Sequence, residues 1–216
     1  MAITPTLDLE RELFANGVKY VGGVDEVGRG AIAGPVTVGV AVIDAHVAEF
    51  PQGLRDSKLM SKHAREKIIA ATQGWVVAHA LGSASAQEID DIGIVNALRL
   101  AWMRAYEQLD VKPDHVILDG KHNWIAPTDV NLLTPELIDI PVTMKIKADA
   151  HCAVVAAASV LAKVSRDQEM VWLHEQYPQF GWNSNVGYGA AVHMQAITEL
   201  GATEYHRRSW NLPTRL

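Results

Sequence analysis

Apolar and β-branched runs recur along the chain and predict five strands. They cover residues 18–26, 36–44, 75–82, 115–120 and 140–147. The run at 36–44 is almost continuously apolar, which is typical of a strand that is covered on both faces. Because the connection between the first two runs is short, we expect these two strands to pair in antiparallel fashion.

Between and after the strands, apolar residues at helical spacing predict five helices. They cover about 7–16, 61–73, 86–109, 151–170 and 190–200. Gly17 would end the first helix, and Ser61 would cap the second. The fourth helix is rich in alanine, which would let it pack closely against a sheet. Residues 121–139, which contain Pro127 and Pro135, are expected to form an irregular connection.

The length of 216 residues suits one domain with an appendage. Strands that alternate with helices predict an α/β core over residues 1–170. From residue 171 onward, aromatic residues are crowded together with Gly, Asn and His. We expect 171–216 to form a helical extension that packs on the core as part of one structural unit. Most of its aromatic side chains would form a small core of their own, whereas Tyr188, between two glycines, would be exposed.

Charge and cysteine content narrow the possible roles. The net charge of −6 argues against a protein that coats nucleic acid by bulk electrostatics, but a local basic groove is compatible with it. The tail residues His206, Arg207 and Arg208 would supply such local positive charge. The single Cys152 excludes an internal disulfide and fits a reducing compartment. No secretory signal or membrane-spanning run is recognisable, so we expect a cytoplasmic protein.

The first strand ends on two acids, Asp25 and Glu26, and a glycine-rich turn at residues 28–30 follows them. Such a pair is usually a solvated loop entrance when it stands alone. Acids at the end of a buried strand are costly unless they are solvated, paired or bound to a cation. The glycines let backbone approach a phosphate closely, and Arg29 could bind one through two hydrogen bonds. Together these features suggest metal-assisted chemistry on a phosphodiester.

Further acids and bases follow at comparable places. Asp119 ends another apolar strand before a glycine, and ligands of open α/β sheets sit at strand ends. Asp149 precedes the alanine-rich helix, where it is either an N-cap or a group aimed into the same crevice. Lys58 is either a phosphate contact or a solvated loop lysine. Lys163 and Arg166 are three residues apart and share a helix face. Asp90 and Asp91 fall in the first turns of a helix, where acids suit its dipole.

An ordered set of motifs then becomes recognisable. It comprises Asp-Glu-Val-Gly-Arg-Gly, Asp-Ser-Lys-Leu, Leu-Asp-Gly, Lys-Ala-Asp-Ala, Gly-Tyr-Gly and His-Arg-Arg-Ser-Trp, over about residues 18–210. The set resembles ribonuclease HII. The resemblance implies a ribonuclease H-like fold, which is a mixed five-stranded sheet flanked by helices, with a C-terminal helical extension. It also implies cleavage of the RNA strand of RNA–DNA hybrids and cleavage at single ribonucleotides embedded in duplex DNA.

The resemblance also assigns roles to residues. Catalysis and metal binding fall to four acids, Asp25, Glu26, Asp119 and Asp149. Substrate binding falls to Gly28, Arg29, Gly30, Tyr188, Lys58, Lys163 and Arg166. The glycine turn would recognise the ribonucleotide-to-DNA junction, the tyrosine would pack beside that junction, and the last three residues would contact phosphates. The sequence departs from the family at Ala190-Ala191, where Thr and a basic or polar residue are common, so one phosphate contact is expected to be missing.

The implied chemistry needs two divalent cations. Four carboxylates can hold such a pair, and all-oxygen ligands favour Mn²⁺ or Mg²⁺ over zinc. The products would carry 5′-phosphate and 3′-hydroxyl ends, and the 2′-OH would distinguish RNA from DNA. Since successive side chains on a strand point to opposite faces, Asp25 and Glu26 can share a site only if the strand ends or bulges between them. We therefore predict irregular backbone at residues 26–28.

Two other functions stay open. The chain could be a non-catalytic module that binds hybrids, although its four intact acids speak against this. It could also be a DNA-strand nuclease on the same fold. The related ribonuclease HIII carries an extra N-terminal domain and lacks the arginine in the glycine turn, so this chain with Arg29 fits HII better.

Overall fold

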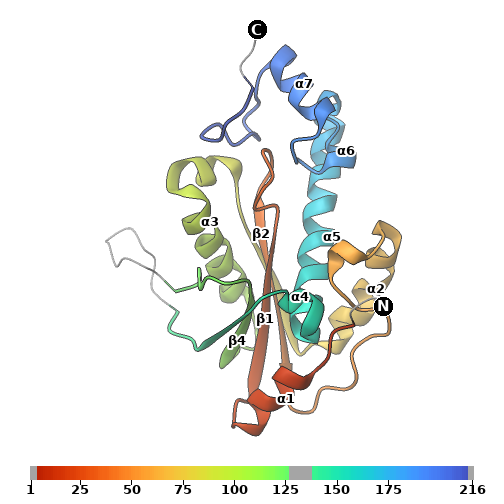
Figure 1. The fold of residues 1–216 in the computed structure, drawn as a ribbon, viewed down its shortest axis with the longest axis vertical. Coiled ribbons are helices and arrows are strands. Elements are labelled where there is room, and N and C mark those ends of the chain that lie inside the picture. Colours follow the sequence, from red (N-terminus) through yellow and green to blue (C-terminus); the bar gives the residue numbers. More distant parts are fainter. Residues whose placement is uncertain (1–3, 127–137, 214–216) are drawn as a thin grey trace.

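The computed structural model describes residues 4–126 and 138–213. In these residues a five-stranded sheet has the order β3-β2-β1-β4-β5, with β1 at its centre (Figure 1). The strands are β1 (Tyr20–Val27), β2 (Val36–Asp44), β3 (Ala78–Ala84), β4 (His115–Asp119) and β5 (Val142–Lys145). The pairs β1–β2 and β2–β3 are antiparallel, and β1–β4 and β4–β5 are parallel. The predicted mixed five-stranded sheet is confirmed, and so is the antiparallel first pair.

Helices connect and cover the strands. They are α1 (Asp8–Ala15), α2 (Lys62–Trp75), α3 (Ala86–Gln108), α4 (Ala148–His151), α5 (Ala153–Gln176), α6 (Trp182–Asn185) and α7 (Ala191–Leu200), with 3-10 turns at Ser57–Leu59 and Pro178–Phe180. Ser61 caps α2 as predicted, because its side chain accepts from the Ala64 N–H. The predicted helix end at about residue 170 is wrong, since α5 continues to Gln176. Pro127 and Pro135 lie outside the described residues.

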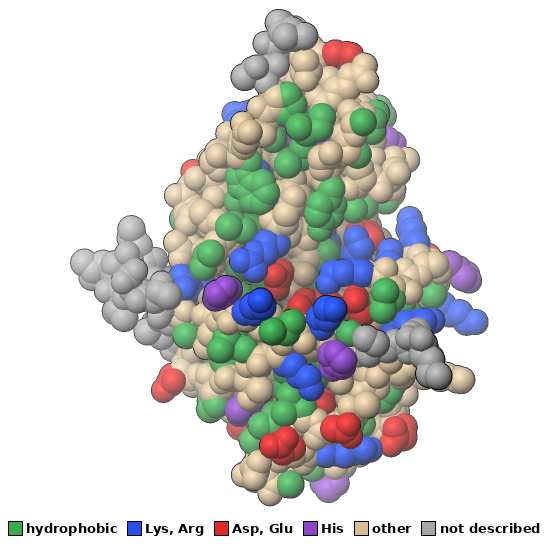
Figure 2. All heavy atoms as spheres, viewed as in Figure 1, with side chains coloured by type: hydrophobic (Ala, Val, Ile, Leu, Met, Phe, Trp, Pro, Cys, Tyr) green, Lys and Arg blue, Asp and Glu red, His purple; other side chains and the backbone are tan. Residues whose placement is uncertain are grey.

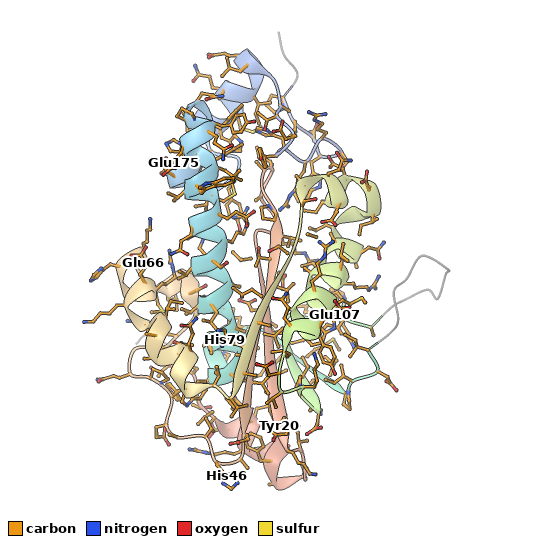
Figure 3. All side chains as sticks on the ribbon, turned by 180° about the vertical axis from the view of Figure 1, so that it is seen from behind. Tyr20, His46, Glu66, His79, Glu107 and Glu175 are labelled. Carbon is orange, nitrogen blue, oxygen red and sulfur yellow. The ribbon has the colours of Figure 1, made fainter. Side chains whose placement is uncertain are left out.

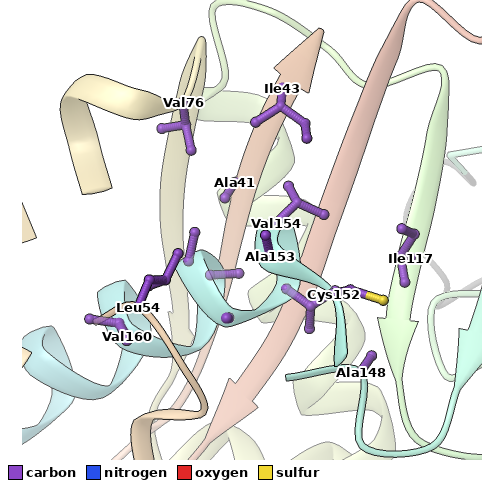
Figure 4. Close-up of a cluster of buried hydrophobic side chains, with 14 of the residues drawn as sticks. Ala41, Ile43, Leu54, Val76, Ile117, Ala148, Cys152, Ala153, Val154 and Val160 are labelled. Carbon is purple, nitrogen blue, oxygen red and sulfur yellow. The ribbon is translucent and has the colours of Figure 1, made fainter. Parts of the chain in front are cut away.

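Each face of the sheet has its own hydrophobic core. Helix α3 covers one face, where it packs on alternate residues of β1, β2 and β4. Helix α5, with α1 and α2 beside it, covers the other face (Figures 1 and 4). The alternation follows from the pleat, which sends successive side chains of a strand to opposite faces. Strands buried on both faces explain the nearly continuous apolar sequence of β2.

Glycines in the strands bring the helices unusually close. A Cβ added at Gly23 would lie 2.4 Å from the carbonyl carbon of Val154 in α5, and one at Gly39 would lie 2.5 Å from the Ala158 oxygen. On the opposite face, a Cβ at Gly82 of β3 would lie 2.0 Å from the Ala101 oxygen of α3. The small residues of α5 therefore allow backbone to pack on backbone, as the alanine-rich sequence predicted.

Seen from behind, β3 runs between α3 and α5 (Figure 3). The labelled side chains place His79 on β3, Glu107 on α3 and Glu175 on α5. None of the helices in the described part of the chain combines the length and apolar character needed to cross a lipid bilayer.

The C-terminal segment has a small aromatic core of its own. The rings of Phe180 and Trp182 stack with centroids 5.2 Å apart, and both side chains are buried. Helix α7 packs over them through Ala196 and Ile197. The predicted aromatic core beneath the last helix is confirmed for these two rings, and Tyr188 is exposed as predicted, at 39%.

Candidate active site

Two of the candidate acids, Asp25 and Asp119, lie near the C-terminal ends of two adjacent parallel strands, at the same edge of the sheet. Strands β1 and β4 run parallel with Val24 opposite Leu118, so Asp25 and Asp119 are the next residues of each strand. Val24 and Leu118 face α3. Because successive side chains of a strand point to opposite faces, Asp25 and Asp119 lie on the other face, which α5 covers. Asp25 is only 4% exposed. The two strand-end acids of the sequence therefore lie on the same face of the sheet, at the ends of neighbouring strands.

The third acid comes from the helix that follows β5. The Ala148 N–H donates to Asp119 Oδ1 over 2.7 Å, which ties the start of α4 to the end of β4. Asp149 lies in the first turn of α4 and is buried, at 3% exposure. It is not an N-cap, since Lys147 holds that position and no side chain caps this helix. The structure thus brings Asp149 to the same edge as Asp119.

Lys58 supplies a positive charge to these acids. Its Nζ donates to Asp149 Oδ2 over 2.9 Å, although most of the lysine side chain is exposed. Burial lowers the pKa of Lys58, but the hydrogen bond to Asp149 and the charge of Asp25 outweigh burial, so the pKa is raised above its usual value. Lys58 is therefore not simply a solvated loop lysine, because in this arrangement it is bound to one of the acids.

The backbone around Glu26 differs from the prediction. Strand β1 pairs regularly with β2 through Val27, which lies opposite Thr37, so the irregular backbone expected at 26–28 is wrong for residues 26 and 27 and is found only at Gly28, where φ is +81°. Glu26 consequently starts from the face opposite to Asp25. It lies at the end of the strand and remains partly exposed, with Oε1 3.2 Å from Arg29 Nη1. Burial raises the pKa of Glu26, Arg29 opposes this, and the charge of Asp119 raises it further. Glu26 thus stands within electrostatic reach of Asp119.

The acids are short of positive charge in this arrangement. Burial raises the pKa of Asp25 to about 8, and the nearby charges of Glu26 and Asp149 add to the effect. The Ser159 hydroxyl and Lys58 oppose it. Burial also raises the pKa of Asp119, with a contribution from Asp149. A buried carboxylate that resists ionisation is the kind of group that a bound cation stabilises.

The donor set fits a hard divalent cation in its chemistry. The side chains that meet at the edge are carboxylates, and oxygen donors suit Mg²⁺ and Mn²⁺. Within residues 4–126 and 138–213, however, no three His, Cys, Asp or Glu side chains are grouped closely enough to hold a metal ion as they stand. Lys58 bonded to Asp149 and Arg29 bonded to Glu26 supply the countercharges instead. Metal binding would therefore require these two basic side chains to release their acids.

The glycine turn and Tyr188 lie side by side next to the acids. Gly28 has φ +81°, and a Cβ there would lie 2.0 Å from Arg166 Nε, so only glycine fits. A Cβ on Gly30 would lie 3.9 Å from Tyr188 Cε1. Arg29 and Gly30 are exposed, which leaves this surface open to a ligand. The structure thus brings together the turn and the tyrosine that the sequence singled out.

The predicted phosphate contact by Arg166 is wrong. Its side chain is fully buried, and its three guanidinium nitrogens donate to the carbonyls of Pro35, Val186 and Ala33. Lys163 is mostly buried, and its Nζ lies 2.6 Å from Asp167 Oδ1. The i,i+3 spacing indicated a shared face of α5, but it could not tell that Arg166 is covered by the segment before β2 and by Val186.

The predicted positive charge of the tail is also largely wrong. His206 and Arg207 are buried, so Arg208 is the exposed member of the three. Asp90, expected to serve the helix dipole, instead accepts from the main-chain N–H groups of Arg208 and Ser209 over 2.7 and 2.9 Å. The acid on α3 therefore anchors the tail.

A chain of hydrogen bonds that the sequence did not reveal connects the tail to Tyr188. The Thr203 N–H donates to His206 Nδ1 over 2.9 Å, so the His206 proton is on Nε2 and points to His193 Nε2, 3.0 Å away. Trp182 Nε1 also donates to His193 Nε2, which leaves the proton of His193 on Nδ1, 2.8 Å from the Tyr188 carbonyl. Both imidazoles are neutral in this network.

We expect the contribution of His206 to the stability of the fold to decrease as the pH falls from about 6.5 toward 4. Burial, together with the nearby imidazole of His193 and the charge of Arg208, lowers the pKa of His206 to about 4. The unfolded chain binds a proton at this histidine below about pH 6.5, whereas the folded chain does not, so acid favours unfolding by roughly 2 kcal/mol at pH 5. Urea unfolding at pH 7 and pH 5 would measure the change.

Two variants isolate the contribution of this histidine. His206→Gln should lose part of the acid sensitivity, whereas His46→Gln, at an exposed position, should keep all of it. An unchanged pH dependence in His206→Gln would contradict the assignment, whatever the carboxylates contribute to both variants.

On the surface, acidic side chains near the centre of one face are surrounded by Lys and Arg (Figure 2). Of the candidate site residues, Arg29 and Lys58 are exposed, and Glu26 and Asp119 are partly exposed. A face with buried acids and a basic border is suited to an anionic ligand that carries its own cations.

Sequence comparisons agree with the motif analysis. A family model described as Ribonuclease HII matches residues 22–212. Ribonuclease HII of Streptomyces avermitilis is 47% identical over 208 residues, which cover 95% of this chain and 83% of the relative. Ribonuclease HII of Paracoccus denitrificans is 41% identical over 209 residues, which cover 95% of this chain and 91% of the relative.

Solved structures show the same fold. Ribonuclease H2 from Pyrococcus horikoshii superposes with a TM-score of 0.68 at 27% identity, over 89% of this chain and 94% of that chain. Bst-RNase HIII in complex with Mn²⁺ gives 0.67 at 21% identity, over 89% of this chain and 67% of that chain. The ribonuclease H-like fold is thereby confirmed. The chain belongs to the ribonuclease HII family and is a ribonuclease H endonuclease that acts on nucleic acid.

Proposed function

We propose that this protein cleaves the RNA strand of RNA–DNA hybrids, and duplex DNA at single embedded ribonucleotides, to give 5′-phosphate and 3′-hydroxyl ends. The observation that carries the proposal is the convergence of Asp25, Asp119 and Asp149 at one sheet edge, beside the surface formed by the glycine turn and Tyr188. Acids and a recognition surface this close allow one duplex to contact both.

The acids Asp25, Glu26, Asp119 and Asp149 would hold two divalent cations, Mn²⁺ or Mg²⁺. When bound, such ions activate a water molecule and stabilise the leaving oxygen. The chain itself orients two of the ligands, because the Glu26 N–H donates to Asp25 Oδ1 over 2.9 Å and the Ala148 N–H fixes Asp119. Glu26 would have to turn around the end of β1 to join them.

The basic side chains would change partners when the substrate binds. Lys58 and Arg29, once released from Asp149 and Glu26, are long enough and exposed enough to contact phosphates. The glycine turn would recognise the 2′-OH at the ribonucleotide-to-DNA junction, and Tyr188 would pack on the adjacent sugar or base. Lys163 would contact a phosphate only if its ion pair with Asp167 opened.

The test is cleavage of a duplex that carries a single ribonucleotide. We expect cutting with Mn²⁺ or Mg²⁺ and none with a chelator, because the buried acids need a cation to act. A matched all-DNA duplex should stay intact. Cleavage of the DNA control would indicate a DNA-strand nuclease, and tight binding without cleavage in any metal would indicate a non-catalytic binding module.

A further inference from the structure

Arg207 is buried beneath the glycine turn. Its side chain is fully buried and binds main-chain carbonyls. Nη1 donates to the Arg29 carbonyl over 2.8 Å, Nη2 donates to the Gly28 carbonyl over 2.6 Å, and Nε and Nη2 donate to the Gly34 carbonyl over 3.3 and 3.1 Å. No ion pair to a carboxylate is formed by Arg207 in the part of the chain that the structure describes. One guanidinium therefore fixes both peptide units of the turn.

These contacts determine where the opposite side of the turn points. In a trans peptide the C=O of one residue and the N–H of the next point in opposite directions. Because the carbonyls of Gly28 and Arg29 point inward to Arg207, the N–H groups of Arg29 and Gly30 point outward. Neither N–H donates to an acceptor within the described residues, and both residues are exposed. Two successive outward N–H groups form a site for an anionic or hydroxyl oxygen.

Arg207 is itself held rigidly. Its own N–H donates to the Ile32 carbonyl over 2.9 Å, and its guanidinium lies 4.8 Å from the ring centroid of Trp210. The next two residues of the chain, Arg208 and Ser209, are bound by Asp90. The main chain is thus fixed on both sides of the side chain, which leaves the guanidinium one position.

The arrangement is expensive for the fold. Burial lowers the pKa of Arg207 to about 9, and the charge of Arg166, buried nearby, contributes to the effect. Burying two cations without carboxylate partners costs stability, and apolar side chains could fill the same space. A role in substrate binding accounts for a guanidinium there better than stability does.

We propose that Arg207 is a positioning residue, which orients the N–H groups of Arg29 and Gly30 toward the 2′-hydroxyl oxygen of the ribonucleotide. It does not contact the substrate, because it is buried behind the turn. The inference rests on the proposed function, since it explains how the same surface would recognise a 2′-OH. Removing the guanidinium of Arg207 should weaken recognition of the ribonucleotide. The acids should be unaffected, because Arg207 does not contact them.

The experiment compares Arg207→Lys with Arg208→Lys. Lysine keeps the buried charge but cannot reach all three carbonyls, whereas Arg208 is exposed next door and serves as the matched control. We expect Arg207→Lys to raise KM for the single-ribonucleotide duplex about tenfold, with a smaller change in kcat, because at least one charge-assisted hydrogen bond is lost. Arg208→Lys should stay within about twofold. An unchanged KM in Arg207→Lys, or an equal rise in the control, would overturn the proposal.

Two measurements that do not depend on cleavage complete the test. Hydrogen exchange of the amides of 28–34 should accelerate in Arg207→Lys and not in Arg208→Lys, and unchanged exchange would overturn the positioning role. In the ¹⁵N-labelled wild-type protein with chelator, the Arg29 and Gly30 amide resonances should shift with the ribonucleotide duplex and not with the all-DNA duplex. The absence of that difference would overturn the proposal even if Arg207→Lys did not fold.

These readouts also separate the two proposals. If the wild-type protein failed to cleave the ribonucleotide duplex while the two amides still distinguished it from DNA, the proposed function would fail and the positioning role would stand. If cleavage occurred while the amides did not respond, the function would stand and the role of Arg207 would fail.

Discussion

Replacing Asp25 by asparagine is expected to abolish cleavage and, at the same time, to stabilise the metal-free protein. Asn offers a neutral amide in place of a carboxylate, so the proposed cation binding at the end of β1 would be lost. We expect cleavage to fall by about a thousandfold or more, since bound metal ions contribute several kcal/mol to such reactions. The assay is cleavage of the single-ribonucleotide duplex with Mn²⁺.

The same substitution is expected to raise stability, because Asp25 is buried in the folded chain. The pKa of Asp25 is raised to about 8 by burial, and further by Glu26 and Asp149. The folded chain therefore binds a proton that the unfolded chain releases above about pH 4, and the contribution of Asp25 to stability falls as the pH rises from 4 to 8. At pH 7 the carboxylate costs on the order of 2 to 4 kcal/mol, which Asp25→Asn removes.

Unfolding in chelator measures this gain. Asp110→Asn, at an exposed aspartate between α3 and β4, is the matched control and should change neither cleavage nor stability. Near-normal cleavage by Asp25→Asn would remove Asp25 from the metal site. Lower stability of the metal-free variant would show that the carboxylate is ionised and well paired in the folded chain, contrary to the argument from burial.

Gly82→Ala adds a single methyl group to β3 and is expected to destabilise the protein strongly. The added Cβ would lie 2.0 Å from the Ala101 oxygen and 2.5 Å from the Ala105 nitrogen, and both are backbone atoms of α3. Because a helix backbone cannot turn away as a side chain can, α3 would have to move off β3. We expect a cost of about 3 kcal/mol or more, and a fall in Tm of roughly 6 to 12 °C.

Gly74→Ala is the matched control for this substitution. Gly74 lies in α2 with nothing within 4 Å of an added Cβ. The same chemical change should therefore raise stability by about 0.5 to 1 kcal/mol through reduced chain entropy. Thermal unfolding of both variants decides the matter, and a loss in Gly82→Ala no larger than 1 kcal/mol would mean that α3 moves more easily than its packing implies.

Local patterns were enough to predict the sheet and the position of its acids. Alternating and continuous apolar runs located all five strands, and an acid at the end of two of these runs located Asp25 and Asp119. These features depend on residues that are neighbours in sequence, so periodicity and strand ends report them. The pairing of Glu26 could not be read in this way, because it is fixed by the register of β1 on β2 rather than by local composition.

The buried arginines show more clearly which features could not be predicted from local sequence. Arg166 and Lys163 lie on the same side of α5, yet the first is buried against Ala33 and Val186 while the second pairs within its own helix. Arg207 stands beside Arg208 in sequence, and only one of them faces the glycine turn, 178 positions away. A charged side chain reads as exposed in sequence unless a distant segment is known to cover it.

The central place of β1 has a consequence for how the chain is made. The strand emerges early in synthesis, but its neighbour β4 and its covering helix α5 follow about a hundred residues or more later. Until then the apolar face with Gly23 has no backbone to pack on, and nascent chains of this length are prone to aggregate. A ribosome-bound chain that has not yet produced α5 should consequently depend on chaperones, and it should be unable to cut nucleic acid until α5 has been made.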